Sequence, residues 1–360
     1  MSTVDHYGTL FPAAVVGSLP RPDFVREAVT GERALDAERA EQVMDAAVTY
    51  ALTLQEEAGL DVVTDGEWRR ASYIGVIAEL AHGFEVGLNP ADGRPWTVVT
   101  SELAEKDAGF IAREIEFLKQ KTDRRIKATL PAPALLGERM WDAENSHAAY
   151  PTRQSFVEAC VPVLRRELEL LRDAGADIVQ IDDPHLCLLV DDQVRAGYDD
   201  PEAEADFAAA TTNAVVEGID DVRLAVHLCR RAGARVRGEA LHTGGYGPIL
   251  THLNRLKVHH LTMEFTSPGA GDAEVFKALR EDFEIGLGCV GVHPGEVDAP
   301  EVIVERVERA LEYLAPERVV LNPDCGFAPG SAARVDIDEV YVKLQNEVEA
   351  ARRLREKYAQ

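Results

Sequence analysis

Eight short runs of aliphatic and β-branched residues, each leading into a longer segment with helical periodicity, constrain the fold of this chain more than any other feature. Runs of this kind are typical of strands that are buried on both faces of a parallel sheet. We therefore predict strands at residues 13–18, 61–65, 125–130, 177–182, 222–228, 259–264, 284–290 and 318–322.

The intervening segments repeat their apolar residues at helical spacing. We predict helices at residues 37–58, 156–174, 201–218, 273–280, 301–314 and 336–357. Eight strand-then-helix units in a chain of 360 residues fit a (β/α)8 TIM barrel. A doubly wound open sheet is the alternative, but no Gly-x-Gly-x-x-Gly follows the first strand, so its dinucleotide-binding form loses its main support. We interpret residues 1–360 as one barrel domain with an excursion at about residues 83–100, where Gly and Pro are frequent.

The charge of the chain argues against two classes of partner. The formal net charge is −25, which repels phosphate backbones and anionic lipid surfaces, so we expect neither nucleic acid nor a membrane as a partner. The first residues lack the basic start and apolar stretch of a secretion signal, which predicts a cytoplasmic protein.

The five cysteines are widely scattered along the chain. A cysteine with a chemical role is therefore expected to be a metal ligand or a nucleophile, and a disulfide framework is not expected.

Polar residues close most of the predicted strands. In a barrel enzyme the chemistry lies at the carboxyl ends of the strands, where such side chains converge on one mouth. These residues are Ser18, Asp65, Glu67, Asp182, Asp183, His227, Cys229, Glu264, His293, Asp324 and Cys325.

Four of them have the chemistry of a zinc shell: His227, Cys229, Glu264 and Cys325 offer one imidazole, two thiolates and one carboxylate. Their dispersed spacing differs from a local CxxC knuckle and suits a catalytic site on a barrel rim. Taken singly, a histidine at a strand end is often just hydrogen-bonded, and a cysteine in an apolar run is often a small hydrophobic residue. It is the combination that indicates zinc.

The chain resembles the C-terminal catalytic barrel of cobalamin-independent methionine synthase over nearly its whole length. The order of HxC, then Glu, then NPDCGF at strand ends is the most specific part of the likeness. The matching stretches are VVGSLPRP (15–22), DGEWRR (65–70), VQIDDPHL (179–186), VHLCRR (226–231), TMEF (262–265) and VLNPDCGF (320–327).

The resemblance implies a site as well as a fold. It implies zinc bound by the four residues named above and a homocysteine site in which Ser18 lies near the carboxylate, with Glu67 and Asp182 holding the ammonium. It places His293 where the family has a histidine proposed to handle protons near the methyl donor, and the ordinary pKa of histidine suits that task.

The shell composition agrees with alkyl transfer to sulfur. A free thiol, with a pKa of about 8.5, is mostly protonated at neutral pH, whereas a zinc-bound thiol is ionised. Two thiolates and a carboxylate outweigh the charge of the ion, which keeps the bound sulfur reactive.

The methyl donor and two further interpretations stay open. The chain has room for only one of the two barrels of plant and enterobacterial methionine synthases, and its third unit, KATLPAPALLGERMW, lacks the expected Thr-Gly-Pro turn, although Trp141 could substitute as a stacking residue. The donor is then either a methylfolate or a methylated corrinoid protein. One alternative is a zinc-dependent epoxyalkane:coenzyme M transferase, for which Arg69, Arg70, Arg230 and Arg231 could hold a sulfonate; another is a zinc-free methyl-carrier or corrinoid-binding barrel.

Overall fold

A curled parallel sheet forms the centre of the protein. The computed structural model describes residues 3–88, 95–231, 242–328 and 335–358. Its seven-stranded sheet has the order β1-β4-β5-β6-β7-β8-β9, and every neighbouring pair is parallel. The strands are β1 (Val62–Val63), β4 (Arg125–Pro131), β5 (Ile178–Asp182), β6 (Arg223–Leu228), β7 (His260–Met263), β8 (Glu284–Val290) and β9 (Val319–Pro323).

An eighth segment closes the sheet into a barrel. Ala13 forms a parallel bridge to Leu321 of β9, and Ala14 forms one to Val62 of β1. The Ala14 N–H donates to the Leu321 carbonyl at 3.0 Å, and the Val62 N–H donates to the Ala13 carbonyl at 3.2 Å. The segment therefore joins the two edge strands, and the predicted (β/α)8 barrel is confirmed.

The second strand is shorter than the predicted 61–65, and Gln55 supplies the reason. Its side-chain amide accepts from the Thr64 N–H at 2.9 Å and donates to the Thr64 carbonyl at 2.8 Å. The Thr64 hydroxyl donates to the Gly17 carbonyl at 2.8 Å. A glutamine from a helix thus replaces the strand ladder at this point, which satisfies the buried backbone groups without a neighbouring strand.

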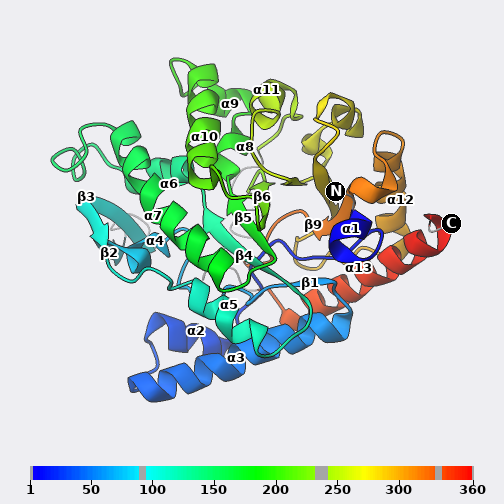
Figure 1. Cartoon of the computed structure of the whole chain (residues 1–360), viewed down its shortest axis with the longest axis horizontal. Helices are drawn as coiled ribbons and strands as arrows, with labels where there is room; N and C mark the ends of the chain where they lie inside the picture. The colour runs from blue at the N-terminus through cyan, green and yellow to red at the C-terminus, as the bar shows by residue number, and fades with distance from the viewer. Residues whose placement is uncertain (1–2, 89–94, 232–241, 329–334, 359–360) are drawn as a thin grey trace.

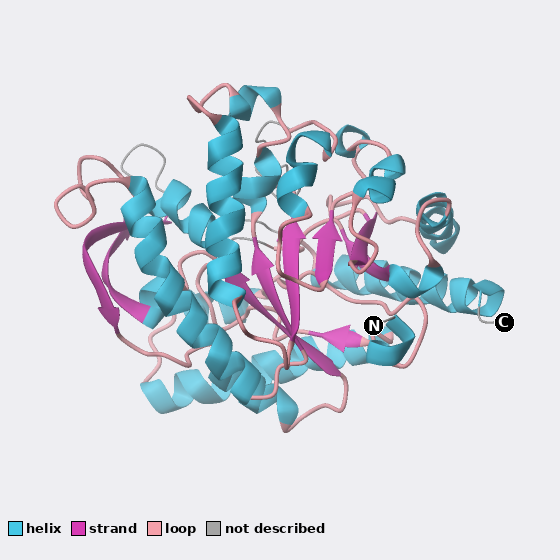
Figure 2. Ribbon diagram, turned by 45° about the horizontal axis from the view of Figure 1, so that its top comes forward, coloured by secondary structure: helices cyan, strands magenta, loops and turns pink. Residues whose placement is uncertain are grey.

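Helices surround the barrel (Figures 1 and 2), and α3 and α13 lie side by side along one flank. The helix predicted at 37–58 is found over the same residues, capped by Asp36, whose side chain accepts from the Arg39 N–H, and ended by Gly59 in the left-handed region. The helices are α1 (Thr3–Tyr7), α2 (Asp23–Thr30), α3 (Ala37–Ala58), α4 (Ile77–Leu80), α5 (Ala112–Lys119), α6 (Pro133–Met140), α7 (Arg153–Asp173), α8 (Pro184–Leu188), α9 (Asp192–Arg195), α10 (Pro201–Val216), α11 (Leu250–Leu253), α12 (Pro300–Leu311) and α13 (Ile337–Tyr358). The predicted helix at 273–280 is instead a 3-10 helix over Ala273–Ala278, a geometry used in short pieces.

An antiparallel hairpin of β2 (Ala81–Leu88) and β3 (Pro95–Glu105) leaves the barrel between β1 and β4. It occupies the region of the predicted excursion at 83–100, although residues 89–94 lie outside the described residues. A bulge follows His82, at Gly83, whose φ of 118° suits glycine. The interpretation of residues 1–360 as one domain stays a prediction.

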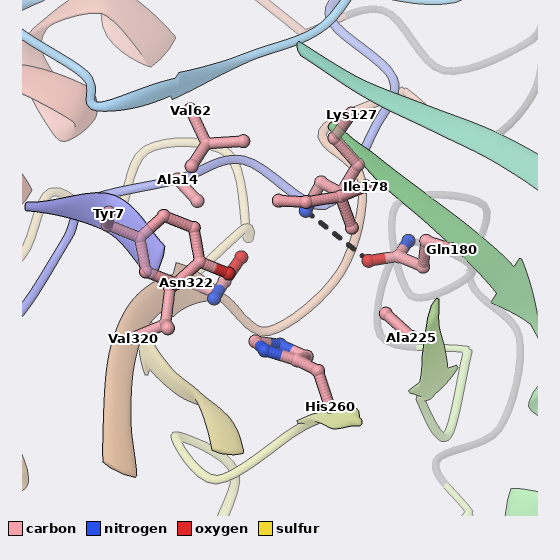
Figure 3. Close-up of a pocket in the computed structure, with 10 residues that line it drawn as sticks. All are labelled: Tyr7, Ala14, Val62, Lys127, Ile178, Gln180, Ala225, His260, Val320 and Asn322. Atoms are coloured by element: carbon pink, nitrogen blue, oxygen red, sulfur yellow. Dashed lines mark hydrogen bonds between the residues drawn. The ribbon is translucent and has the colours of Figure 1, made fainter. Parts of the chain in front are cut away.

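Large apolar side chains fill the space between barrel and helices, and polar side chains occupy part of the barrel interior. A cavity of about 10 Å³ lies there, lined among others by Lys127, Gln180, His260 and Asn322 (Figure 3). A cavity of about this size holds at most one water molecule, so it is not a substrate site. Among the described residues, no helix has both the length and the hydropathy that a membrane span requires.

Candidate metal centre

Three of the four predicted metal ligands meet at the carboxyl ends of the barrel strands. His227 is the penultimate residue of β6, Cys229 directly follows that strand, and Cys325 follows β9. All three are buried, and one ligand atom from each lies within 4.8 Å of the other two. The barrel thus brings together side chains that are nearly a hundred residues apart in the sequence.

The orientation of His227 leaves one ring nitrogen for a ligand. Its Nδ1 lies 3.0 Å from Asp182 Oδ1, while its buried Nε2 has no hydrogen-bond partner among the described residues. A carboxylate can only accept, so an ionised Asp182 requires the proton on Nδ1 and leaves the lone pair on Nε2. Histidine ligands of metals are commonly held by a carboxylate in this way.

The two thiols fit a dication. Their Sγ atoms are 3.6 Å apart, and a tetrahedral ion with Zn–S bonds of about 2.3 Å would hold two sulfurs roughly 3.8 Å apart. The hydrogen bond between Cys229 and Cys325, together with burial, raises the pKa of Cys229 well above its ordinary value. Two thiolates this close repel each other, and a bound cation removes that repulsion. The buried Nε2 of His227 and the paired thiols are therefore a donor set suited to zinc.

Glu264, the fourth predicted ligand, lies directly after β7 but outside this group of three. It is fully buried, with Oε2 accepting from the Arg230 N–H and Oε1 from the Ser267 hydroxyl, both at 2.8 Å. A carboxylate oxygen that accepts one hydrogen bond keeps a second lone pair, so these bonds and a metal bond are compatible. Its role as a ligand stays a prediction.

Asp324 ties the loop after β7 to the loop after β9. Its Oδ1 accepts from the N–H groups of Phe265 and Thr266 at 3.0 Å each, and its Oδ2 accepts from the Thr266 hydroxyl. Burial and the nearby Glu264 raise the pKa of Asp324 to about 7. These hydrogen bonds connect Asp324, the residue before Cys325, with Phe265, the residue after Glu264, and so hold the two predicted ligands on connected loops.

Two glycines make room for the predicted substrate-binding residues Ser18 and Glu67. A Cβ on Gly17 would lie 2.6 Å from Glu67 Oε1, and a Cβ on Gly326 would lie 2.3 Å from Ser18 Oγ. Ser18 Oγ accepts from the Ala328 N–H at 3.3 Å, which places Ser18 against the loop that carries Cys325. A residue larger than glycine at position 17 or 326 would therefore collide with the side chain of Glu67 or Ser18.

Glu67 is buried and held in an uncommon backbone conformation, with φ of 59°. Its Oε1 accepts from the Thr129 hydroxyl at 2.8 Å. Burial, followed by the nearby Asp182 and Asp65, raises the pKa of Glu67, and the neighbouring Arg70 only partly offsets this. A cationic ligand beside Glu67 and Asp182 would relieve this accumulation of negative charge.

The arginines next to Glu67 in the sequence form ion pairs with other carboxylates. Arg70 donates to Glu114 Oε2 at 3.0 Å and to both oxygens of Thr129, and Arg69 pairs with Asp45. Glu67 forms no ion pair within 4.0 Å in the part of the chain that the structure describes.

Arg230 is also occupied. Its guanidinium lies 4.3 Å from the ring centroid of Tyr246 and donates to the carbonyls of Gly244 and Ala270. It is 2% exposed, and its contacts brace the loop after β6. Its neighbour Arg231 has φ of 59°, which turns the chain sharply after the metal ligands.

The structure does not bring His293 to this group. The side chain is 44% exposed, and its Nδ1 contacts are the Pro294 carbonyl at 3.0 Å and Glu296 Oε1 at 3.6 Å, both in its own loop after β8. Trp141 is half-buried and donates to the Tyr150 carbonyl at 3.0 Å. The roles of both residues stay predictions.

Tyr73 is a residue to which the sequence did not draw attention. Burial raises the pKa of its hydroxyl, and the charges of Cys229, Asp182 and Cys325, in that order, raise it further. It belongs to the irregular segment between β1 and α4, where no periodicity marks a residue as inward-facing.

Comparison with known proteins shows the family to which the chain is similar. Residues 11–353 match the model of the family described as cobalamin-independent synthase, catalytic domain. The methionine synthase of Sulfolobus acidocaldarius is 27% identical over 329 residues, covering 89% of this chain and 86% of the relative. That of Saccharolobus islandicus is 28% identical over 325 residues, covering 88% of each.

Solved structures share the fold. A B12-independent methionine synthase from a Shewanella species, in complex with selenomethionine, superimposes with a TM-score of 0.79 at 19% identity, covering 98% of this chain and 99% of that one. A methyltransferase from Methanosarcina mazei gives a TM-score of 0.59 at 16% identity, covering 96% and 97%.

Proposed function

The chain belongs to the cobalamin-independent synthase family by its catalytic domain, and on that premise we propose that it transfers a methyl group to the thiol of homocysteine, giving methionine. We further propose that the reaction depends on zinc held by His227, Cys229 and Cys325 and completed by Glu264. The observation that carries the proposal is the buried group of one imidazole and two thiols at the mouth of the barrel.

The ion would supply one thing to the chemistry: it would keep the thiol of the substrate ionised at neutral pH. The protein supplies the rest. Asp182 holds His227 in the tautomer that leaves Nε2 free, and the carboxyl ends of β6 and β9 fix the two cysteines. The burial of all three excludes water, which would protonate a thiolate or compete for the methyl group.

Recognition of an amino-acid thiol follows from the charges next to the metal centre. Glu67 and Asp182 are buried carboxylates, and the charge of Asp182 helps to raise the pKa of Glu67; an ammonium group would pair with both. Ser18 would contact the carboxylate of the substrate from the loop that follows the first barrel segment. Homocysteine carries the three groups that such a site recognises, namely a thiol, an ammonium and a carboxylate.

The coenzyme M interpretation finds less support. Its sulfonate would need a cation beside the metal centre, but three of the four arginines named for it, Arg69, Arg70 and Arg230, are paired with groups of the protein itself. The carboxylates of Glu67 and Asp182 would repel a sulfonate.

A methylfolate is the donor that we propose, because the family is described as cobalamin-independent. Proton delivery by His293 is part of this proposal and would require its exposed loop to approach the bound donor. A corrinoid donor and a zinc-free carrier function become outcomes of the test.

A substrate panel tests the proposal. The zinc-loaded protein is incubated with homocysteine or coenzyme M, and with methyltetrahydrofolate carrying one or three glutamates, methylcobalamin, or epoxypropane. We expect methionine from homocysteine and a methylfolate, and none after the zinc has been removed. Product from coenzyme M and epoxypropane alone, or zinc-independent turnover, would refute the proposal, while turnover with methylcobalamin alone would replace its donor.

A further inference from the structure

A row of buried polar side chains leads from the barrel interior to the metal ligand His227. Lys127 on β4 is 4% exposed, and its Nζ donates to Gln180 Oε1 on β5 at 3.3 Å (Figure 3). Gln180 Nε2 donates to Asp182 Oδ1 at 2.8 Å, and the same oxygen lies 3.0 Å from His227 Nδ1. The row therefore joins three strands and ends at the candidate metal centre.

Each member of the row can play only one part. An ammonium can only donate, so the amide oxygen of Gln180 must face Lys127, with a second donor in the Thr262 hydroxyl at 3.3 Å. The amide nitrogen then faces two acceptors, Asp182 Oδ1 and the Val16 carbonyl at 3.1 Å. A flipped amide would place donor against donor on one side and acceptor against acceptor on the other.

The orientation of Gln180 decides that of Asp182. With the amide nitrogen fixed, Asp182 keeps Oδ1 turned toward the barrel interior, where it also accepts the proton of His227 Nδ1.

We propose that Lys127 and Gln180 are positioning residues for the metal centre: through Asp182 they fix the tautomer of His227 that coordinates metal by Nε2. Neither residue touches the metal or the substrate. The inference rests on the metal centre of the proposed function, and it adds a structural reason for a lysine in the interior of the barrel.

Two substitutions interrupt the row at different points. Gln180→Glu keeps the size of the side chain but sets a carboxylate against Asp182 Oδ1, and Lys127→Met removes the charged donor while keeping a long apolar side chain. Asn322→Leu is the matched control, because Asn322 is equally buried and lines the same cavity, but no hydrogen bond joins its side chain to the row in the described residues.

The experiment measures zinc affinity by competition with a chelator and the tautomer of the histidines by ¹⁵N NMR of histidine-labelled, zinc-loaded protein, both without substrate. We expect Gln180→Glu to weaken zinc binding about 10- to 100-fold, the range for partners of metal ligands, and to lose the His227 signals of protonated Nδ1 and metal-bound Nε2. Lys127→Met should shift both readouts in the same direction, whereas Asn322→Leu should leave them unchanged.

Wild-type zinc affinity and His227 signals in both variants would overturn the inference, and so would an equal loss in Asn322→Leu. If Gln180→Glu does not fold, Lys127→Met decides alone. A native protein that binds no zinc would refute the metal centre as well, whereas one that binds zinc but makes no methionine would refute only the proposed reaction.

Discussion

Cys229 and Cys325 lie with their Sγ atoms 3.6 Å apart although 96 residues separate them in the sequence. The two residues follow β6 and β9, strands that are not neighbours in the sheet. Only a curled, closed sheet brings the ends of these strands together, so the metal centre depends on barrel closure at Ala13 and Ala14.

Replacing either thiol should abolish metal binding. Cys229→Ser and Cys325→Ser each remove one thiolate and leave a weaker ligand, so we expect zinc to fall from about one per chain to a small fraction of that. Metal analysis of dialysed protein measures the stoichiometry. Cys160→Ala is the control, because Cys160 is buried in α7 and its variant should keep its zinc. Full zinc content in both serine variants would contradict the assignment.

Glu67→Gln should affect the ammonium group of the substrate and little else. Loss of one hydrogen bond to a charged group costs about 1.5–3 kcal/mol, which corresponds to a rise in KM for homocysteine of about 10- to 100-fold. The comparison substrate is 4-mercaptobutanoate, which has the thiol and the carboxylate but no ammonium group. Its KM should barely change, and a parallel loss for both thiols would show that Glu67 does not bind the ammonium.

Gly17→Ala should reproduce the effect of Glu67→Gln by a different route. The added Cβ would lie 2.6 Å from Glu67 Oε1, so the carboxylate must move. We expect a raised KM for homocysteine with unchanged zinc content. Gly247→Ala is the control, since nothing lies within 4 Å of its added Cβ. A native KM in the Gly17→Ala variant would mean that the position of Glu67 is not important for binding.

Lys127 should make the free energy of unfolding of the protein depend on pH in the alkaline range. Burial lowers the pKa of Lys127 from 10.5 to about 8. Between these values the unfolded chain binds a proton that the folded protein has released, so this group makes the free energy of unfolding rise with pH. Below pH 8 the buried, charged Lys127 lowers the free energy of unfolding by the full amount, and above pH 10.5 it no longer lowers it.

The measurement compares the native protein with Lys127→Met by denaturant unfolding at about pH 7.5, below this interval, and at about pH 10.5, its upper end. A shift of this size corresponds to about 3 kcal/mol, so the native protein should gain roughly that much relative to the variant over the interval. Other titrating groups cancel in the difference. A constant difference would show that Lys127 titrates as an ordinary exposed lysine.

The sequence predicted the barrel and the meeting of His227, Cys229 and Cys325 because both depend on local patterns: apolar runs mark the strands, and HxC or NPDC marks their ends. It did not predict the role of Gln180, since which interior side chains meet depends on the register between strands, and Thr129 pairs with Gln180 only in the folded sheet. It likewise suggested Arg230 as a residue that could hold a sulfonate, whereas the guanidinium stacks on Tyr246 and donates to the carbonyls of Gly244 and Ala270. The closing segment at Ala13 and Ala14 shows the same limit, because only two residues of the predicted strand at 13–18 form bridges to its neighbours.

X-ray absorption at the zinc edge, with and without homocysteine, tests the central claim most directly. The zinc-loaded protein should show two sulfur neighbours from Cys229 and Cys325, with the remaining neighbours nitrogen or oxygen, and a third sulfur on addition of homocysteine. A sulfur count that stays at two under saturating homocysteine would contradict activation of the substrate thiol at this centre.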